Sequence, residues 1–174
     1  MKKAFCLFFV SIILVVIGYF ISIYAFCNAI QCEKLYCDEI LKFSEYYAIN
    51  IRGHLFAGYL ALGGFLLSLK AFIVVTMKDN VYDNQKYKDN WLKQKKFRPE
   101  LKLYTPLKEL SDFLYFAIFA SILSAVFQMS IGLIDHWVAS VFSIWSAIYA
   151  ALLLINCLML IKKNLDSWFS YLED

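Results

Sequence analysis

The polar stretch Lys78–Glu109 decides the fold, and it reads KDNVYDNQKYKDNWLKQKKFRPELKLYTPLKE. It carries nine of the 17 basic residues in the 174-residue chain. Two long apolar runs precede this stretch and two follow it. An apolar run of roughly 18 to 20 residues is long enough to cross a hydrocarbon core of about 30 Å. The charge of the central stretch therefore sets the orientation of everything around it.

The four apolar runs cover residues 4–27, 55–77, 113–134 and 137–161. Apolar residues make up 61% of the chain, more than is usual for a soluble domain. Buried helices of a soluble protein would need polar faces to cover them, and the sequence shows none. The first run is too long for the apolar region of a signal peptide, so we expect a retained span. The sequence predicts an all-α integral membrane protein, a four-transmembrane-helix bundle formed by a single domain over residues 1–174.

Basic residues mark the cytoplasmic side, because lysine and arginine resist transfer across the membrane during insertion. The ends of the chain carry two lysines each, at positions 2 and 3 and at positions 162 and 163. Residues 28–51 have two basic residues against four acidic ones, and the turn after residue 134 has no lysine or arginine. We therefore predict a multi-pass protein of the bacterial inner membrane with both termini and residues 78–109 in the cytoplasm. The loop 28–54 then lies outside.

Two prolines shape the cytoplasmic segment. Pro99 disfavours helix at Arg98, so span two should continue as a helix into the cytoplasm until that point. Thr105 and Pro106 are typical of an N-cap and a first helical residue, so span three should begin near Thr105. Two protruding helices would then frame a basic platform, residues 78–109. The tail, residues 162–174, is predicted to lie along the inner interface.

The outer loop contains apolar residues at helical spacing: Ile40, Phe43, Tyr47 and Ile51. This pattern predicts a short amphipathic helix at the outer interface, with Tyr46 and Tyr47 at headgroup depth.

Small residues recur at helical spacing on the spans. In membranes they mark close helix contacts, within one chain or between chains. We expect a homo-oligomer, with a tetramer favoured. On span two the stripe consists of Ala57, Ala61, Gly64, Ser68 and Ala71. On spans three and four it consists of Ala117, Ser121, Ser124 and Gln128, and of Ala139, Ser143, Ser146 and Ala150.

Four polar side chains fall within or beside the spans: Lys70, Asp112, Gln128 and Asn156. A lysine at membrane depth needs a partner or a path to the interface, and we expect Lys70 to pair with Asp112 or Asn156. Gln128 is predicted to bond to a neighbouring helix, although a ring of glutamines around an oligomer axis is an alternative.

Basic and aromatic residues alternate in the platform, and this pattern has three interpretations. They are binding of anionic lipid headgroups, docking of an acidic cytosolic protein, and contact with nucleic acid. Five acidic residues interrupt the run, so we do not expect direct nucleic-acid binding. The candidate binding residues are Lys86, Lys88, Trp91, Lys93, Lys95, Lys96 and Arg98.

Little in the sequence points to chemistry. Cys32 and Cys37 lie on the oxidising outer side and are a candidate disulfide, although helical spacing would hold them too far apart. No metal-ligand spacing, phosphate-binding glycine loop or nucleophile motif is present. We therefore expect no metal, no cofactor and no enzymatic activity.

Two functional classes fit these features. The first is a membrane sensor or anchor whose platform recruits a soluble partner, and the second is an oligomeric pore or membrane-disrupting effector. In size and layout, over the four spans and residues 78–109, the chain resembles the four-span subunit of the Kiwa anti-phage system. That resemblance implies an assembly that reports envelope disturbance to a cytosolic DNA-binding partner. It carries over no site residues, because it rests on architecture.

Overall fold

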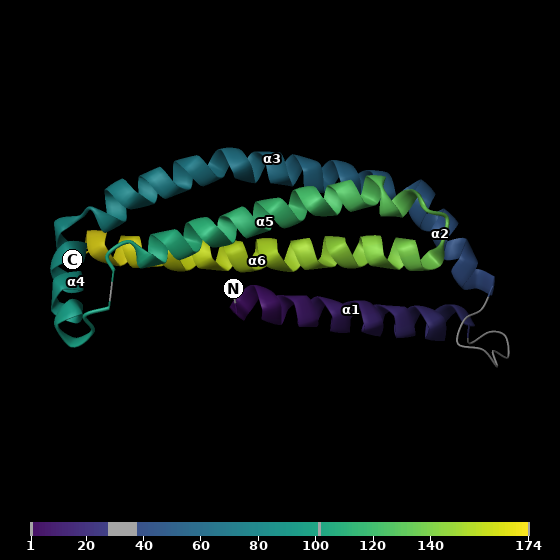
Figure 1. Ribbon diagram of the computed structural model, residues 1–174, viewed down its shortest axis with the longest axis horizontal. Helices are drawn as coiled ribbons and strands as arrows, with labels where there is room; N and C mark the ends of the chain where they lie inside the picture. The colour runs from purple at the N-terminus through teal and green to yellow at the C-terminus, as the bar shows by residue number, and fades with distance from the viewer. Residues whose placement is uncertain (1, 28–37, 101, 174) are drawn as a thin grey trace. The chain divides into compact units, whose positions relative to one another are not determined.

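The structure, a computed structural model, describes residues 2–27, 38–100 and 102–173, with side chains described for residues 4–22, 43–100 and 102–166. Every regular element in these ranges is helical (Figure 1). Four helices are long and apolar enough to span a membrane: α1 (Lys2–Cys27), α3 (Arg52–Met77), α5 (Thr105–Met129) and α6 (Trp137–Glu173). They coincide with the four predicted spans, which confirms the all-α class and four candidate membrane-crossing helices.

The predicted helix of the outer loop is present as α2 (Asp38–Asn50). Its two neighbouring tyrosines differ sharply, since Tyr46 is 59% exposed whereas Tyr47 is fully buried. Tyr47 is thus packed within its own chain, whereas the depth of both tyrosines in a membrane stays a prediction. The partner of Tyr47 is Gln128 in α5, 81 positions along the chain, which periodicity within α2 does not reveal.

The predicted continuous helix from span two to Pro99 was also wrong. After α3 the chain forms a single π-helical turn, η1 (Lys78–Tyr82), closed by a hydrogen bond from Asp83 N to Lys78 O. A separate helix, α4 (Gln85–Phe97), then begins. Asn84 has an extended backbone and its side chain accepts from Lys86 N, so it is the N-cap of α4. The end of α4 before Arg98 and Pro99 is as predicted.

Two local signals place the starts of the last long helices. α5 begins at Thr105, one residue before Pro106, within the ordinary uncertainty of a helix boundary. The short 3₁₀ turn η2 (Ile131–Leu133) follows α5, and α6 begins at Trp137. His136 caps α6 by accepting from Val138 N at its Nδ1. α6 continues to Glu173, so the tail is part of a helix that begins in the last apolar run.

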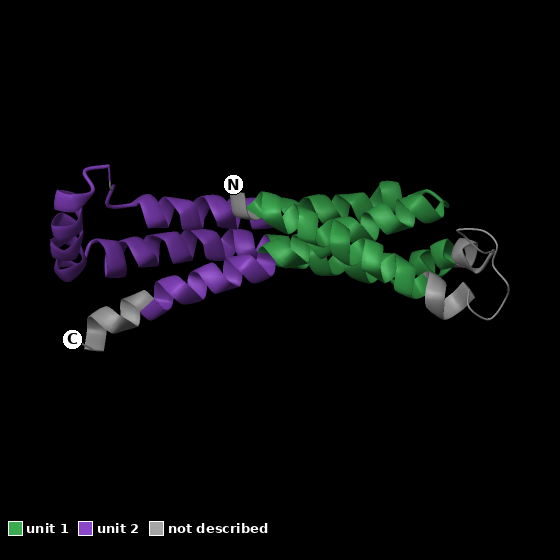
Figure 2. Cartoon of the chain, turned by 90° about the horizontal axis from the view of Figure 1, so that it is seen from below, with its two compact units in different colours: residues 1–63, 119–153 green, residues 64–118, 154–174 purple. Residues whose placement is uncertain are grey.

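The chain divides into two compact units (Figure 2). The first comprises residues 1–63 and 119–153. In it, α1 contacts α6, because Trp145 Nε1 donates to Ser11 Oγ at 2.9 Å and the Phe8 ring packs edge-on against Trp145. α3 contacts α6 through the Tyr59 hydroxyl, which donates to Ala147 O at 2.7 Å.

The second unit comprises residues 64–118 and 154–174. In it, α4 joins the end of α3 to the start of α5 and lies across the direction of the long helices (Figure 1). Its core consists of Met77, Val81, Tyr82 and Leu107, with Ile73, Val74, Tyr87 and Leu165 packed against them. This unit contains the basic platform.

Candidate functional site

The platform is held together by the hydrophobic core at its base. The π turn of η1 brings Val81 and Tyr82 inward, where they are 5% and 2% exposed. The Tyr82 hydroxyl also donates to Asn164 Oδ1 of α6 at 3.2 Å. Since burying such large side chains is worth roughly 1.5 to 3 kcal/mol each, this core fixes the position from which α4 departs.

Asp83 lies at the junction between η1 and α4 and makes several of the polar contacts within the platform. It accepts a hydrogen bond of 2.9 Å from the Tyr104 hydroxyl, and Lys88 Nζ lies 3.4 Å from its carboxylate. The hydrogen bond from Tyr104, then the charge of Lys88, hold the pKa of Asp83 below its usual value. The same hydrogen bond raises the pKa of Tyr104. Asp83 thus ties the start of α4 to the residue before α5.

Four residues of α4 are used inside the platform. Tyr87 packs against the hydrophobic core and its hydroxyl donates to Leu103 O. Lys88 pairs with Asp83, and Lys95 Nζ lies 4.6 Å from the centre of the Trp91 ring. Residues at these spacings share one side of a helix. This side of α4 therefore faces the rest of the platform.

The other side of α4 carries the remaining basic residues. Lys86, Lys93 and Lys96 are exposed, and no ion pair involves them among the described residues. Phe97 lies beside them and is 88% exposed, an unusual position for a large apolar side chain. We call Lys86, Lys93, Lys96 and Phe97 the outward face of α4. The seven predicted binding residues thus divide into three that are used within the platform and three on the outward face, with Arg98 beyond them.

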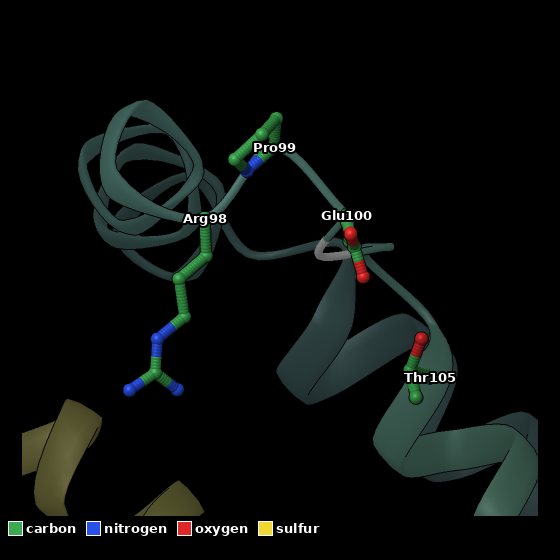
Figure 3. A pocket seen from close by; sticks show the side chains of 4 residues that line it. All are labelled: Arg98, Pro99, Glu100 and Thr105. Atoms are coloured by element: carbon green, nitrogen blue, oxygen red, sulfur yellow. The ribbon is translucent and has the colours of Figure 1, made fainter.

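Arg98 lies at the end of α4 beside a shallow open depression lined by Arg98, Pro99, Glu100 and Thr105. Its guanidinium points away from the Glu100 carboxylate (Figure 3). Because the two charges have opposite sign, the depression has no uniform potential that would select an anion or a cation.

Gln128 is fully buried in the first unit, and each end of its amide group makes a hydrogen bond. Its Nε2 donates to Ser143 O at 2.9 Å, and its Oε1 accepts from the Tyr47 hydroxyl. Burial raises the pKa of Tyr47, against the opposing effects of the Ser143 hydroxyl and the Arg52 charge. This is the predicted bonding between helices, and it leaves no glutamine side chain for a ring around an oligomer axis.

The predicted partner of Lys70 was wrong. Lys70 Nζ lies over the ring of Tyr115, 5.1 Å from its centre, and among the described residues neither Asp112 nor Asn156 pairs with it. Asp112 is exposed on α5, and Asn156 is half-buried on α6.

The small-residue stripes differ in whether they are buried or exposed. Those of α5 and α6 are buried, and Ser124 Oγ lies 3.3 Å from Ser146 Oγ. The stripe of α3 is exposed throughout, and a methyl group added at Gly64 would meet nothing within 4 Å. The adjacent Gly63 is instead buried against Ile122. The face of α3 that contacts its own chain is therefore the one opposite the stripe. The predicted disulfide of Cys32 and Cys37 lies outside the described residues.

Arg52 and Gly132 were missed by sequence reasoning. Arg52 Nη1 donates to Gly132 O at 3.1 Å, and a methyl group at Gly132 would lie 2.8 Å from the Tyr47 hydroxyl. The available signal was a glycine close to the end of the third apolar run, residues 113–134. Comparison of the chain with protein-family models, with curated proteins and with solved structures finds no match.

Proposed function

We propose that the protein is a non-enzymatic, oligomeric membrane sensor or anchor that recruits a soluble cytosolic partner through the outward face of α4. The observation that carries this proposal is the division of the basic residues of α4. Lys88 and Lys95 are used within the platform, whereas Lys86 and Lys93 extend from the opposite side. Basic residues that do not stabilise their own fold are available to another molecule.

A protein partner fits this face better than the bilayer does. Tyr87 packs on the core at the ends of the long helices, so the side of α4 that carries Tyr87 faces those helices. The outward face is on the other side, which directs Lys86 and Lys93 away from a membrane that the long helices cross. An exposed aromatic beside basic residues is typical of a binding anchor, because rigid aromatic side chains dominate interface energetics.

Orientation is part of the proposal. We place both termini and the platform in the cytoplasm of a bacterial inner membrane, on the distribution of lysine and arginine along the sequence. The four candidate spans are compatible with this arrangement.

The exposed stripe of α3 supports the oligomer. Ala57, Ala61, Gly64 and Ser68 are exposed, and among the described residues a Cβ added at Gly64 would meet no atom within 4 Å. Close approach of two such stripes favours helix association in lipid, so we propose that α3 contacts α3 of a second copy in a homo-oligomer, with a tetramer favoured. The alternative, a pore, loses support because its best candidate lining residue, Gln128, is bonded within one chain.

On the resemblance to the Kiwa membrane subunit, we place this recruitment in bacterial anti-phage defence. The test compares three proteins expressed in their host cells. One is the parent, one carries Lys86→Glu, Lys93→Glu and Lys96→Glu, and a control carries Lys102→Glu, Lys108→Glu and Lys163→Glu, which are also exposed. We expect one soluble protein to co-purify with the parent and the control but not with the α4 variant. Equal loss in both variants would contradict the proposal, because non-specific charge would then explain the binding.

A further inference from the structure

Lys70 is a charged side chain set in an apolar surface. It lies seven residues before the end of α3 at Met77, or about 10 Å of helix. Between Lys70 and that end, Phe72 and Val75 are 66% and 58% exposed, as expected of residues that face lipid. The Cα of Lys70 therefore lies at the depth of the hydrocarbon. A charge without a compensating partner is unfavourable at that depth.

Within the described part of the chain, the contact made by this charge is with an aromatic ring and not with a carboxylate. Lys70 Nζ lies 5.1 Å from the centre of the Tyr115 ring. The face of an aromatic ring attracts a cation, but it cannot accept hydrogen bonds from all the N–H groups of an ammonium. An ammonium has three N–H donors. Among the described residues, no Asp or Glu oxygen lies within ion-pair distance of Lys70. The group that balances this charge is therefore to be sought outside the chain.

We propose that Lys70 and Tyr115 form a binding site for the phosphate of an anionic phospholipid in the inner leaflet. Tyr115 is 57% exposed, so the pair opens onto the lipid-facing surface. The long apolar stem of lysine extends from the hydrocarbon towards the phosphate layer, and the ring holds the ammonium in place. Basic positions between membrane helices on the cytoplasmic side are suited to acidic headgroups. This site is independent of the outward face of α4.

Asp112 is the charged residue that acts against this site. It lies three residues before Tyr115, hence on the same side of α5, and it is exposed. Its carboxylate repels a phosphate, so it weakens the site without abolishing it. Removing that charge should strengthen lipid binding, which separates the lipid site from an ion pair between Lys70 and Asp112.

The test titrates the full-length protein, purified in a neutral detergent, with phosphatidylglycerol and with phosphatidylcholine of the same chain length, using native mass spectrometry. We expect the parent to prefer phosphatidylglycerol. Lys70→Met should lower that affinity about fivefold, the effect expected for one basic side chain at an anionic surface. Lys70→Arg should retain it, Asp112→Asn should raise it, and the control Lys108→Met, at an exposed platform lysine, should leave it unchanged.

Three results would overturn the site. They are an unchanged preference in Lys70→Met, an equal loss in Lys108→Met, or competition by free inorganic phosphate as effective as that by lipid. The melting temperature of lipid-free Lys70→Met shows whether that variant folds. If it does not fold, Tyr115→Leu keeps the charge and removes only the ring, and it too should weaken phosphatidylglycerol binding. Unchanged binding in a folded Tyr115→Leu would then reject the site.

Discussion

The Tyr47 hydroxyl donates a hydrogen bond to Gln128 Oε1, and both side chains are fully buried. This bond joins α2 to α5. Gln128 in turn donates to Ser143 O in α6, so one amide side chain connects three helices. Within the first unit, α2 is therefore held against α5 and α6 by a specific polar contact.

Tyr47→Phe should destabilise the protein by about 0.5 to 2 kcal/mol, because it leaves the Gln128 carbonyl oxygen buried without its donor. Unfolding in mixed detergent micelles measures this change. Tyr46→Phe is the matched control, since the neighbouring hydroxyl belongs to an exposed side chain. In a double-mutant cycle, Tyr47→Phe should cost less when Gln128 is already Leu. An equal cost in both backgrounds would show that the two side chains are not coupled.

Gly64→Leu should weaken self-association without unfolding the monomer. A Cβ added at Gly64 meets no atom of the described residues within 4 Å, whereas a leucine there would block close approach of a second α3. Analytical ultracentrifugation in density-matched detergent measures the oligomer. Gly63→Leu is the matched comparison, because a Cβ there lies 2.8 Å from the Ile122 side chain, and it should lower stability instead. The α3 contact is refuted if Gly64→Leu leaves the oligomer intact.

The bond between Asp83 and Tyr104 should stabilise the platform over a defined pH range. The pKa of Asp83 is lowered, so its contribution is full above the ordinary value and is lost as the pH falls through the lowered one. The pKa of Tyr104 is raised, so its contribution is full below the ordinary value near 10 and is lost as the pH rises through the raised one.

Tyr104→Phe tests this range. It should reduce melting temperature between these limits and leave it unchanged at high pH, where the tyrosine of the parent is ionised and the bond is gone. Thermal unfolding followed by circular dichroism from acid to alkaline pH gives both curves. A constant difference between parent and variant at every pH would show that the bond contributes nothing.

Lys88→Gln should loosen α4, whereas Lys93→Gln should not. Lys88 is paired with Asp83 at the junction before α4, while Lys93 lies on the outward face. Amide hydrogen exchange of residues 85–97 in detergent should become faster in Lys88→Gln and stay as in the parent in Lys93→Gln. Equal exchange in the two variants would mean that the basic residues of α4 do not divide as described.

Much of the helical plan could be predicted because its signals are local. The start of α5 beside Pro106, the end of α4 before Pro99 and the start of α6 after a polar turn all depend on adjacent residues. The break before α4 also had a local signal, the N-cap Asn84, which the continuous-helix prediction overlooked.

The faces of the helices were harder to predict. Tyr47 is buried because of a residue 81 positions away, and α3 uses Tyr59 and Gly63 for its own chain instead of its small-residue stripe. For the site, the basic composition of α4 indicated the right helix. The internal use of Lys88 and Lys95 was overlooked although its signal is local, since Asp83 precedes Lys88 by five positions and Trp91 precedes Lys95 by one helical turn.

The most direct test of recruitment by α4 places a photo-crosslinking amino acid at position 93 in the full chain expressed in its host cells. Position 87, packed on the platform core, is the internal control. Irradiation is predicted to link the residue at position 93 to one soluble protein, and the residue at position 87 only to this chain. If position 93 yields lipid adducts alone, or if both positions yield the same adducts, the outward face of α4 is not a recruitment surface.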